Sequence, residues 1–144
     1  MTDSYIALDL ETTGLSPAED RILEIGAVKV IDGEIRETYG TLLNPGLRIS
    51  PRIQELTGIT DEMAAGGKDT RTAVAELVEF CGELPLLGHN ILFDYSFVKK
   101  NAVNFDLAFE KEGIDTLKLA RALLPDVEHK SLTALCCHFG ISQE

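Results

Sequence analysis

Two carboxylates, those of Asp9 and Glu11, stand at the end of an apolar run that begins at Tyr5. Residues two apart on a β-strand point to the same face of the sheet, so a strand here would project both acids side by side. Neighbouring like charges raise each other's pKa or recruit a cation, and carboxylate oxygens suit Mg²⁺ or Mn²⁺. The pattern therefore predicts a divalent metal site. The alternative is an acidic strand end that is simply solvated at a turn.

A third acid, Asp94, falls in the first turns of a helix expected to follow a short buried strand at residues 85–88. An acid near a helix N-terminus is favoured by the helix dipole, which gives a purely structural account of this residue. The functional account is that the strand and the helix start deliver Asp94 to Asp9 and Glu11. On that account the three carboxylates form one catalytic, metal-binding cluster.

The rest of the chain alternates between β-type runs and helical periodicity, which predicts an α/β domain. Asp32-Gly33 between two such runs is a strong hairpin signal, so the sheet should begin antiparallel. Strands are expected at residues 5–10, 21–31, 34–43, 85–88 and 113–117. Helices are expected at residues 50–57, 60–66, 70–82, 91–102, 117–124 and 131–140.

Composition limits the possible functions of these 144 residues. With 44% hydrophobic residues, the chain can bury the core of one domain. No apolar run is long enough to span a bilayer, and the first residues lack the features of a signal peptide. We therefore expect a cytoplasmic protein with no membrane partner. The net charge of −11 disfavours a module that grips nucleic acid by its backbone, but an enzyme that meets phosphates through bound cations remains compatible with it.

The cysteines Cys81, Cys136 and Cys137 show no disulfide or zinc spacing. They are interpreted as small core residues. In the last expected helix, an apolar face should pack against a core; its residues are Leu132, Leu135, Cys136 and Phe139.

Three segments resemble, in the right order, the signatures of DEDD-type 3′→5′ exonucleases: residues 9–15, 56–60 and 89–94. The sequence is similar to the proofreading exonucleases of bacterial DNA polymerase III, including the epsilon subunit and the domain inserted in the Gram-positive polymerase. The resemblance implies a ribonuclease H-like fold with a mixed central sheet of about five strands flanked by helices. It also implies a two-metal site for Mg²⁺ or Mn²⁺ and release of nucleoside 5′-monophosphates from single-stranded or frayed 3′ ends.

By the same resemblance, Asp9 would contact both ions, Glu11 would help hold one, and Asp94 would hold the other. Glu11 and Thr12 would lie near the terminal 3′-hydroxyl, and Leu15 would be an apolar wedge against the base. The implied substrate-binding residues are Thr12, Thr13, Gly14, Leu15, Thr57, Asn90 and Phe93. For Leu15 and Phe93 the alternative is ordinary core packing.

One feature of the family is missing from this sequence. The family carries a histidine, its general base, and an aspartate five residues later, on a helix beyond the point that resembles Gly140-Ile141. We therefore expect residues 1–144 to be a single exonuclease domain that stops before this motif. The second ion should be weak or absent, activity poor, and one apolar sheet face uncovered. A polymerase subunit or a larger parent chain would be the partner.

The three histidines of the sequence are not expected to replace that base. His89 belongs to the family motif without being its base, whereas His129 and His138 are interpreted as a solvated helix cap and a partly buried helix residue. Two other functions stay open: a catalytically inactive exonuclease-fold module used for binding or as a scaffold, and a Mg²⁺-dependent phosphotransfer or nucleotide-hydrolysis domain that shares only the Asp-x-Glu strand. Three retained acids disfavour the scaffold. The choice between DNA and RNA remains open.

Overall fold

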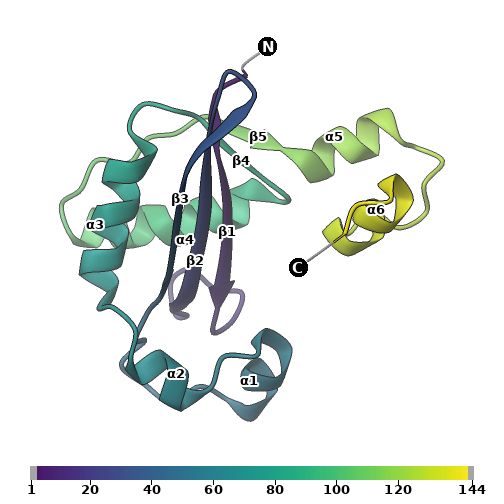
Figure 1. Ribbon diagram of the computed structural model, residues 1–144. Coiled ribbons are helices and arrows are strands. Elements are labelled where there is room, and N and C mark those ends of the chain that lie inside the picture. The colour runs from purple at the N-terminus through teal and green to yellow at the C-terminus, as the bar shows by residue number, and fades with distance from the viewer. Residues whose placement is uncertain (1–2, 143–144) are drawn as a thin grey trace.

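The computed structural model describes residues 3–142, which form one mixed five-stranded sheet with flanking helices (Figure 1). The strand order is β3-β2-β1-β4-β5. The strands are β1 (Tyr5–Thr12), β2 (Ile22–Ile31), β3 (Glu34–Leu42), β4 (Leu86–Gly88) and β5 (Gly113–Asp115). The first three pair antiparallel, while β4 and β5 run parallel to β1. The predicted mixed sheet of about five strands is therefore confirmed.

The hairpin between β2 and β3 forms where the sequence predicts it. Asp32 and Gly33 both adopt positive φ, 51° and 78°, as a tight turn matched to the twist of two antiparallel strands requires. On the other side of β2, the register pairs Glu11 with Glu24, and an irregularity follows between Glu11 and Thr12. This register places two acids opposite each other at the end of β1.

Within residues 3–142, six helices occupy the expected parts of the sequence. They are α1 (Pro51–Thr57), α2 (Asp61–Ala65), α3 (Thr70–Cys81), α4 (Ile91–Asn104), α5 (Thr116–Leu123) and α6 (Leu132–Phe139). All except α4 begin at a residue whose side chain accepts a hydrogen bond from the first turn, the usual way to satisfy the free N–H groups of a helix start. None of the helices in residues 3–142 has the length and apolar character needed to cross a membrane.

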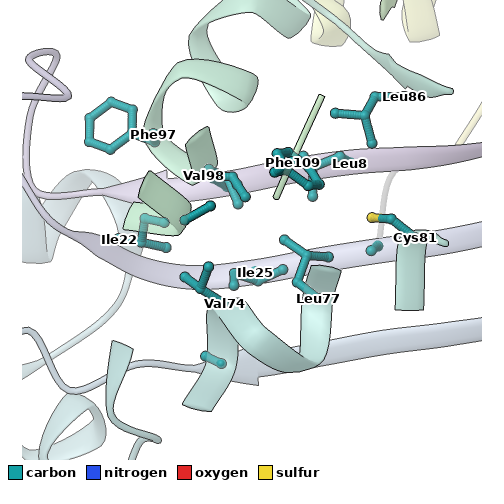
Figure 2. Packing of buried hydrophobic residues seen from close by; sticks show 14 of the residues in the cluster. Leu8, Ile22, Ile25, Val74, Leu77, Cys81, Leu86, Phe97, Val98 and Phe109 are labelled. Carbon is teal, nitrogen blue, oxygen red and sulfur yellow. The ribbon is translucent and has the colours of Figure 1, made fainter. Parts of the chain in front are cut away.

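The core lies between one face of the sheet and helices α3 and α4 (Figures 1 and 2). Along β1, Ile6, Leu8 and Leu10 are buried against these helices, because alternate residues of a strand face the same side. Asp9 and Glu11 consequently project from the other face. The hydrophobic side of the strand holds the acids in place without covering them.

The C-terminal part is less well packed than the sequence suggests. Of the four residues expected to face a core, only Leu135 is buried, while Leu132 and Phe139 are 47% and 58% exposed. The physical reason is position: α5 and α6 lie to one side of the sheet (Figure 1). Helix α6 reaches the second sheet face through Leu132 and Leu135, which share a hollow of about 540 Å³ with Ala7 and Val28. This hollow leaves part of that face uncovered within the described residues.

The interpretation of all three cysteines as core residues is also wrong in part. Cys81 is buried in the main core, Cys136 is only partly buried, and Cys137 is exposed. Cys136 and Cys137 lie on α6, which few other residues cover. Such a helix can bury only one narrow face, so these two cysteines are not fully buried.

Candidate active site

The three predicted acids are brought together at the end of β1. Asp94, in the first turn of α4, is only 4% exposed. Burial and then the charge of Asp9, with a smaller contribution from Glu11, raise its pKa to about 7, although a backbone hydrogen bond from Leu10 works in the other direction. A carboxylate held in this way destabilises the folded chain when it ionises. The ionised carboxylates of the cluster therefore repel one another, and packing alone does not relieve this repulsion.

The two acids of β1 share this repulsion to a lesser degree. Desolvation raises the pKa of Asp9, opposed by a hydrogen bond from the Leu10 backbone. Desolvation also raises the pKa of Glu11, followed by the charges of Asp9 and Glu24. Asp9 keeps an exposed surface, so its carboxylate is only partly desolvated, and Asp94 has the larger shift. Water and ions can thus reach the cluster from the side of Asp9.

The donor set fits a hydrated Mg²⁺ or Mn²⁺ ion. Among residues 3–142, no three histidine, cysteine or carboxylate side chains converge closely enough to enclose a metal by themselves. Magnesium does not need such a cage, since it keeps several waters and is usually held by one or two carboxylates together with substrate phosphates. A divalent cation would also offset the repulsion that raises the pKa values of Asp9, Glu11 and Asp94.

A pocket of about 480 Å³ adjoins the acidic cluster and shares Glu11 with it. Its walls come from the end of β1, the following loop, helix α1 and the start of α4. The lining residues are Leu10, Glu11, Thr12, Thr13, Gly14, Leu15, Ser50, Arg52, Ile53, Leu56, Thr57 and Phe93. Every predicted substrate-binding residue except Asn90 is therefore brought to one pocket.

The two apolar side chains predicted for this pocket behave differently. Leu15 is 85% exposed, so the alternative of core packing is wrong for this residue. Phe93 is half-buried and packs on Phe97, with 5.0 Å between ring centroids. Phe93 thus lines the pocket and also anchors it to the core, whereas Leu15 has no such packing role.

The threonine hydroxyls of the pocket already donate their protons within the protein. Thr12 donates to the Gly14 carbonyl at 2.7 Å, Thr13 to Asp20 at 3.2 Å, and Thr57 to the Ile53 carbonyl at 2.7 Å. A hydroxyl whose proton is engaged can still accept a hydrogen bond through a lone pair. Thr13 and Thr57 already accept the N–H groups of Arg21 and Ile59, so Thr12 has the most accessible lone pairs for a bound ligand.

Asn90 and His89 lie outside the pocket and fasten the start of α4. Asn90 adopts a left-handed conformation (φ 63°), and its backbone N–H donates to Asp115 at 3.0 Å. His89 Nε2 lies 2.7 Å from the Lys130 carbonyl, to which it must donate, and Nδ1 lies 2.9 Å from the Thr116 hydroxyl. Both nitrogens of His89 are thus occupied, which leaves neither to activate a water.

Sequence reasoning missed two charged residues at the site. Glu24 lies opposite Glu11 on β2, and together with Asp9 they line a hollow of about 490 Å³. Arg52 is the basic residue among the described residues that line the pocket. Helical spacing offers a signal for Arg52, because it lies one turn before Leu56. Glu24 could not be found in this way, since no tight turn fixes the register between β1 and β2.

A mixed five-stranded sheet with acids at the end of its first strand is typical of the RNase H-like fold, and solved structures agree. Exonuclease I without ligand has a TM-score of 0.85 and covers 99% of this chain, which covers 38% of that protein. E. coli exonuclease I in complex with a dT13 oligonucleotide has a TM-score of 0.86 with 99% and 37% coverage. Both are 19% identical to this chain, so they establish the fold alone.

Residues 6–144 match the exonuclease (RNase_T) family, and the chain belongs to that family. DNA polymerase III PolC-type from Clostridium perfringens is 40% identical over 142 residues, which cover 99% of this chain and 10% of the relative. The corresponding protein of Bacillus subtilis is 38% identical over 142 residues, with 96% and 10% coverage. The chain thus spans about a tenth of the length of these relatives. The predicted resemblance is confirmed, and the family is one of nucleases.

Proposed function

We propose that residues 1–144 form the exonuclease domain of a metal-dependent 3′→5′ exonuclease that releases nucleoside 5′-monophosphates from single-stranded or frayed 3′ ends. One observation carries this proposal: a cluster of mutually repelling carboxylates opens into a pocket with an exposed leucine in its wall. The pocket volume of about 480 Å³ lies within the range of small-ligand sites. Similarity to polymerase III proteins makes proofreading or repair the favoured setting.

The acids would hold Mg²⁺ or Mn²⁺ in this function. When bound, such cations activate a water and stabilise the leaving 3′-oxygen. In the proposed arrangement, Asp9 serves both ions, Glu11 one and Asp94 the other. Asp94 gains most from a cation, because burial and the neighbouring charges oppose its ionisation.

The terminal nucleotide would occupy the pocket next to Glu11. A 3′-hydroxyl is a donor, and both the Glu11 carboxylate and the Thr12 hydroxyl oxygen are available as acceptors. Leu15 would contact the base from the loop, while Phe93 lines the same pocket from α4 and Thr57 lines it from α1. Asn90 would contribute from the start of α4, where its side chain makes no capping hydrogen bond.

Arg52 would contact a phosphate of the same strand end. Its side chain lines the pocket from α1, in a protein whose net charge is −11. A cation at the mouth of an acidic site attracts an anionic substrate from solution. This contact would position the strand without reading its sequence.

His89 is not placed to act as the water-activating base. His89 is occupied on both nitrogens, and neither His129 nor His138 lines the described pockets that contain Asp9 or Glu11. We propose that the histidine, together with a fourth carboxylate, is supplied from outside residues 1–144, in a polymerase or another larger assembly. A second ion would bind weakly without that carboxylate.

The proposal is tested with two 5′-labelled single-stranded oligonucleotides, one with a free 3′-hydroxyl and one with a 3′-phosphate. We expect stepwise shortening of the first only, dependent on Mg²⁺ or Mn²⁺ and abolished by a chelator. Equal cleavage of both, or activity insensitive to chelation, would overturn it. Binding of the free 3′ end with no shortening, even after adding a segment with the family's histidine and aspartate, would instead favour an inactive binding module.

The position of the base is tested by the same assay. The domain extended by that segment should be at least about a hundredfold more active than residues 1–144, the lower end of the contribution typical of general base catalysis. Comparable rates would show that the base lies within residues 1–144.

A further inference from the structure

The loop that carries Leu15, residues 13–21, is closed at its base by backbone hydrogen bonds. The Thr13 N–H donates to the Arg21 carbonyl at 2.8 Å. In return, the Arg21 N–H donates to the Thr13 hydroxyl at 2.9 Å. The loop therefore leaves and re-enters the sheet at a fixed point beside the acidic cluster.

Inside the loop, the carboxylate of Asp20 accepts hydrogen bonds from two neighbouring residues. Asp20 accepts from the Ser16 N–H at 2.9 Å and from the Thr13 hydroxyl at 3.2 Å. Its own N–H donates to the Ser16 carbonyl at 2.7 Å. A Cβ placed on Gly14 would overlap the Asp20 carboxylate, so the backbone and the acid are in direct contact there.

The loop is also attached to the helix that carries Asp94. Lys100 of α4 donates from Nζ to the Ala18 carbonyl at 3.0 Å. The loop thus contacts both the strand of Asp9 and the helix of Asp94.

These hydrogen bonds order a loop whose apolar side chain, Leu15, is exposed to solvent. Leu15 lies between Thr13 and Ser16 and is 85% exposed. Ordering a loop costs conformational entropy, and an ordered leucine on the surface recovers none of that cost by burial. A ligand that covers Leu15 would recover it, which connects the loop to the substrate pocket.

We propose that Asp20 is a positioning residue of this pocket, which holds the 13–16 backbone so that Leu15 meets the base of the terminal nucleotide. The inference rests on the proposed function and deepens it. Asp20 itself does not line the pocket. Its effect on substrate would pass through the loop, and this distinguishes it from Glu11 and Thr12.

Binding of deoxythymidine 5′-monophosphate in the presence of Mn²⁺ tests this inference without requiring catalysis. We expect Asp20→Ala to weaken binding about tenfold, since loss of hydrogen bonds to a charged acceptor depopulates the competent loop. Glu19→Ala is the matched control: it removes the same charge from the same loop, but the Thr13 hydroxyl and the Ser16 N–H donate to Asp20 and not to Glu19. Its affinity should stay within about twofold of the unmodified protein.

Coupling to Leu15 separates positioning from a general structural role. Leu15→Ala should weaken binding on its own, and adding Asp20→Ala to it should cause little further loss, because the two act through one contact. Independent, multiplicative losses would contradict the inference. Amide hydrogen exchange at Ser16 should speed up in Asp20→Ala but not in Leu15→Ala.

A conservative variant keeps the test decisive if Asp20→Ala folds poorly. Asp20→Asn retains an acceptor for the Ser16 N–H and a polar partner for Thr13, so it should restore most of the affinity. Failure of the unmodified protein to bind the monophosphate would refute the proposed product site itself. Tight binding that neither Asp20→Ala nor Asp20→Asn changes would overturn only the role of Asp20.

Discussion

Asp94 and Asp115 occupy similar places in the chain, yet the fold treats them in opposite ways. Both lie at the start of a helix that follows a short parallel strand. Burial and two neighbouring acids raise the pKa of Asp94 to about 7. For Asp115, desolvation is the largest influence and raises the pKa, but backbone hydrogen bonds from Asn90, Leu117 and Lys118, with the charge of Lys118, lower it overall.

The difference identifies Asp115 as a structural acid and supports the metal-binding role proposed for Asp94. Asp115 caps α5 and also ties the start of α4 through Asn90, so its charge is used within the fold. The ionised form of Asp94 is opposed by the fold, which is the pattern common at catalytic and metal sites. Substitution of Asp94 should therefore reduce activity without loss of stability, whereas substitution of Asp115 should reduce stability and leave most activity.

The largest expected effect is on activity. Asp94→Asn should lower exonuclease activity by at least about a hundredfold, because loss of a group that holds or orients a metal ion has effects of this order. Without metal, the same variant should be as stable as the unmodified chain or more stable. Asp115→Ala should retain most activity but lose about 1 kcal/mol of stability, as when a helix cap is removed.

Measurements of activity and of metal-free thermal unfolding on both variants test whether the two acids have these different roles. Similar loss of stability in both would mean that Asp94 is a structural residue. The contrast between the two acids would then not indicate function.

The next effect is on the pH dependence of stability in chelator. The folded-state pKa of Asp94, about 7, lies above its ordinary value of 3.8, so the folded protein holds a proton that the unfolded chain releases. Its stabilising contribution is complete below pH 4 and is lost as pH rises to about 7, amounting to at most about 4 kcal/mol. The lowered pKa of Asp115 works in the opposite sense, since its contribution is present above its ordinary pKa and is lost in acid.

Melting curves between pH 5 and pH 8 test this sign. The difference in melting temperature between the unmodified protein and Asp94→Asn should grow with pH, by several degrees, as about 1 kcal/mol corresponds to about 2–4 °C in proteins of this size. A difference that is constant over this range would show that Asp94 does not titrate there. Saturating Mg²⁺ should remove most of the pH dependence.

The smallest expected effect concerns Arg52. Arg52→Ala should raise KM for an oligonucleotide by about threefold to tenfold with little change in kcat, because a phosphate contact contributes to binding and is weakened by salt. Arg36→Ala is the control. Arg36 lies on β3, away from the pocket, with a guanidinium nitrogen 3.9 Å from a carboxylate oxygen of Glu34. Equal effects of the two substitutions would indicate a general charge effect without a specific contact.

Local chemistry made much of this fold predictable. The turn at Asp32-Gly33, the helix predicted at residues 50–57 and the shared face of Asp9 and Glu11 on β1 each depend on neighbouring residues, and all were predicted correctly. The convergence of Asp94 on Asp9 was also expected, on the basis of the placement of strand and helix.

What remained unpredicted depends on contacts between distant segments. Glu24 faces Glu11 only because of the β1–β2 register, which the intervening loop does not determine. The exposure of Phe139 reflects how little of the fold covers α6, although Phe139 has the spacing of a buried helix face. The opposite environments of Asp94 and Asp115 likewise follow from the groups that surround them in space.

Titration of Mn²⁺ into the metal-free protein, with Asp9→Ala and Asp115→Ala alongside, tests the central claim most directly. The unmodified chain and Asp115→Ala should bind at least one ion with similar affinity and release protons on binding at pH 7, because Asp94 is partly protonated there. Asp9→Ala should bind at least about tenfold more weakly while staying folded. Equal binding by all three proteins, or unfolding of Asp9→Ala without metal, would contradict the assignment of these carboxylates as the metal site.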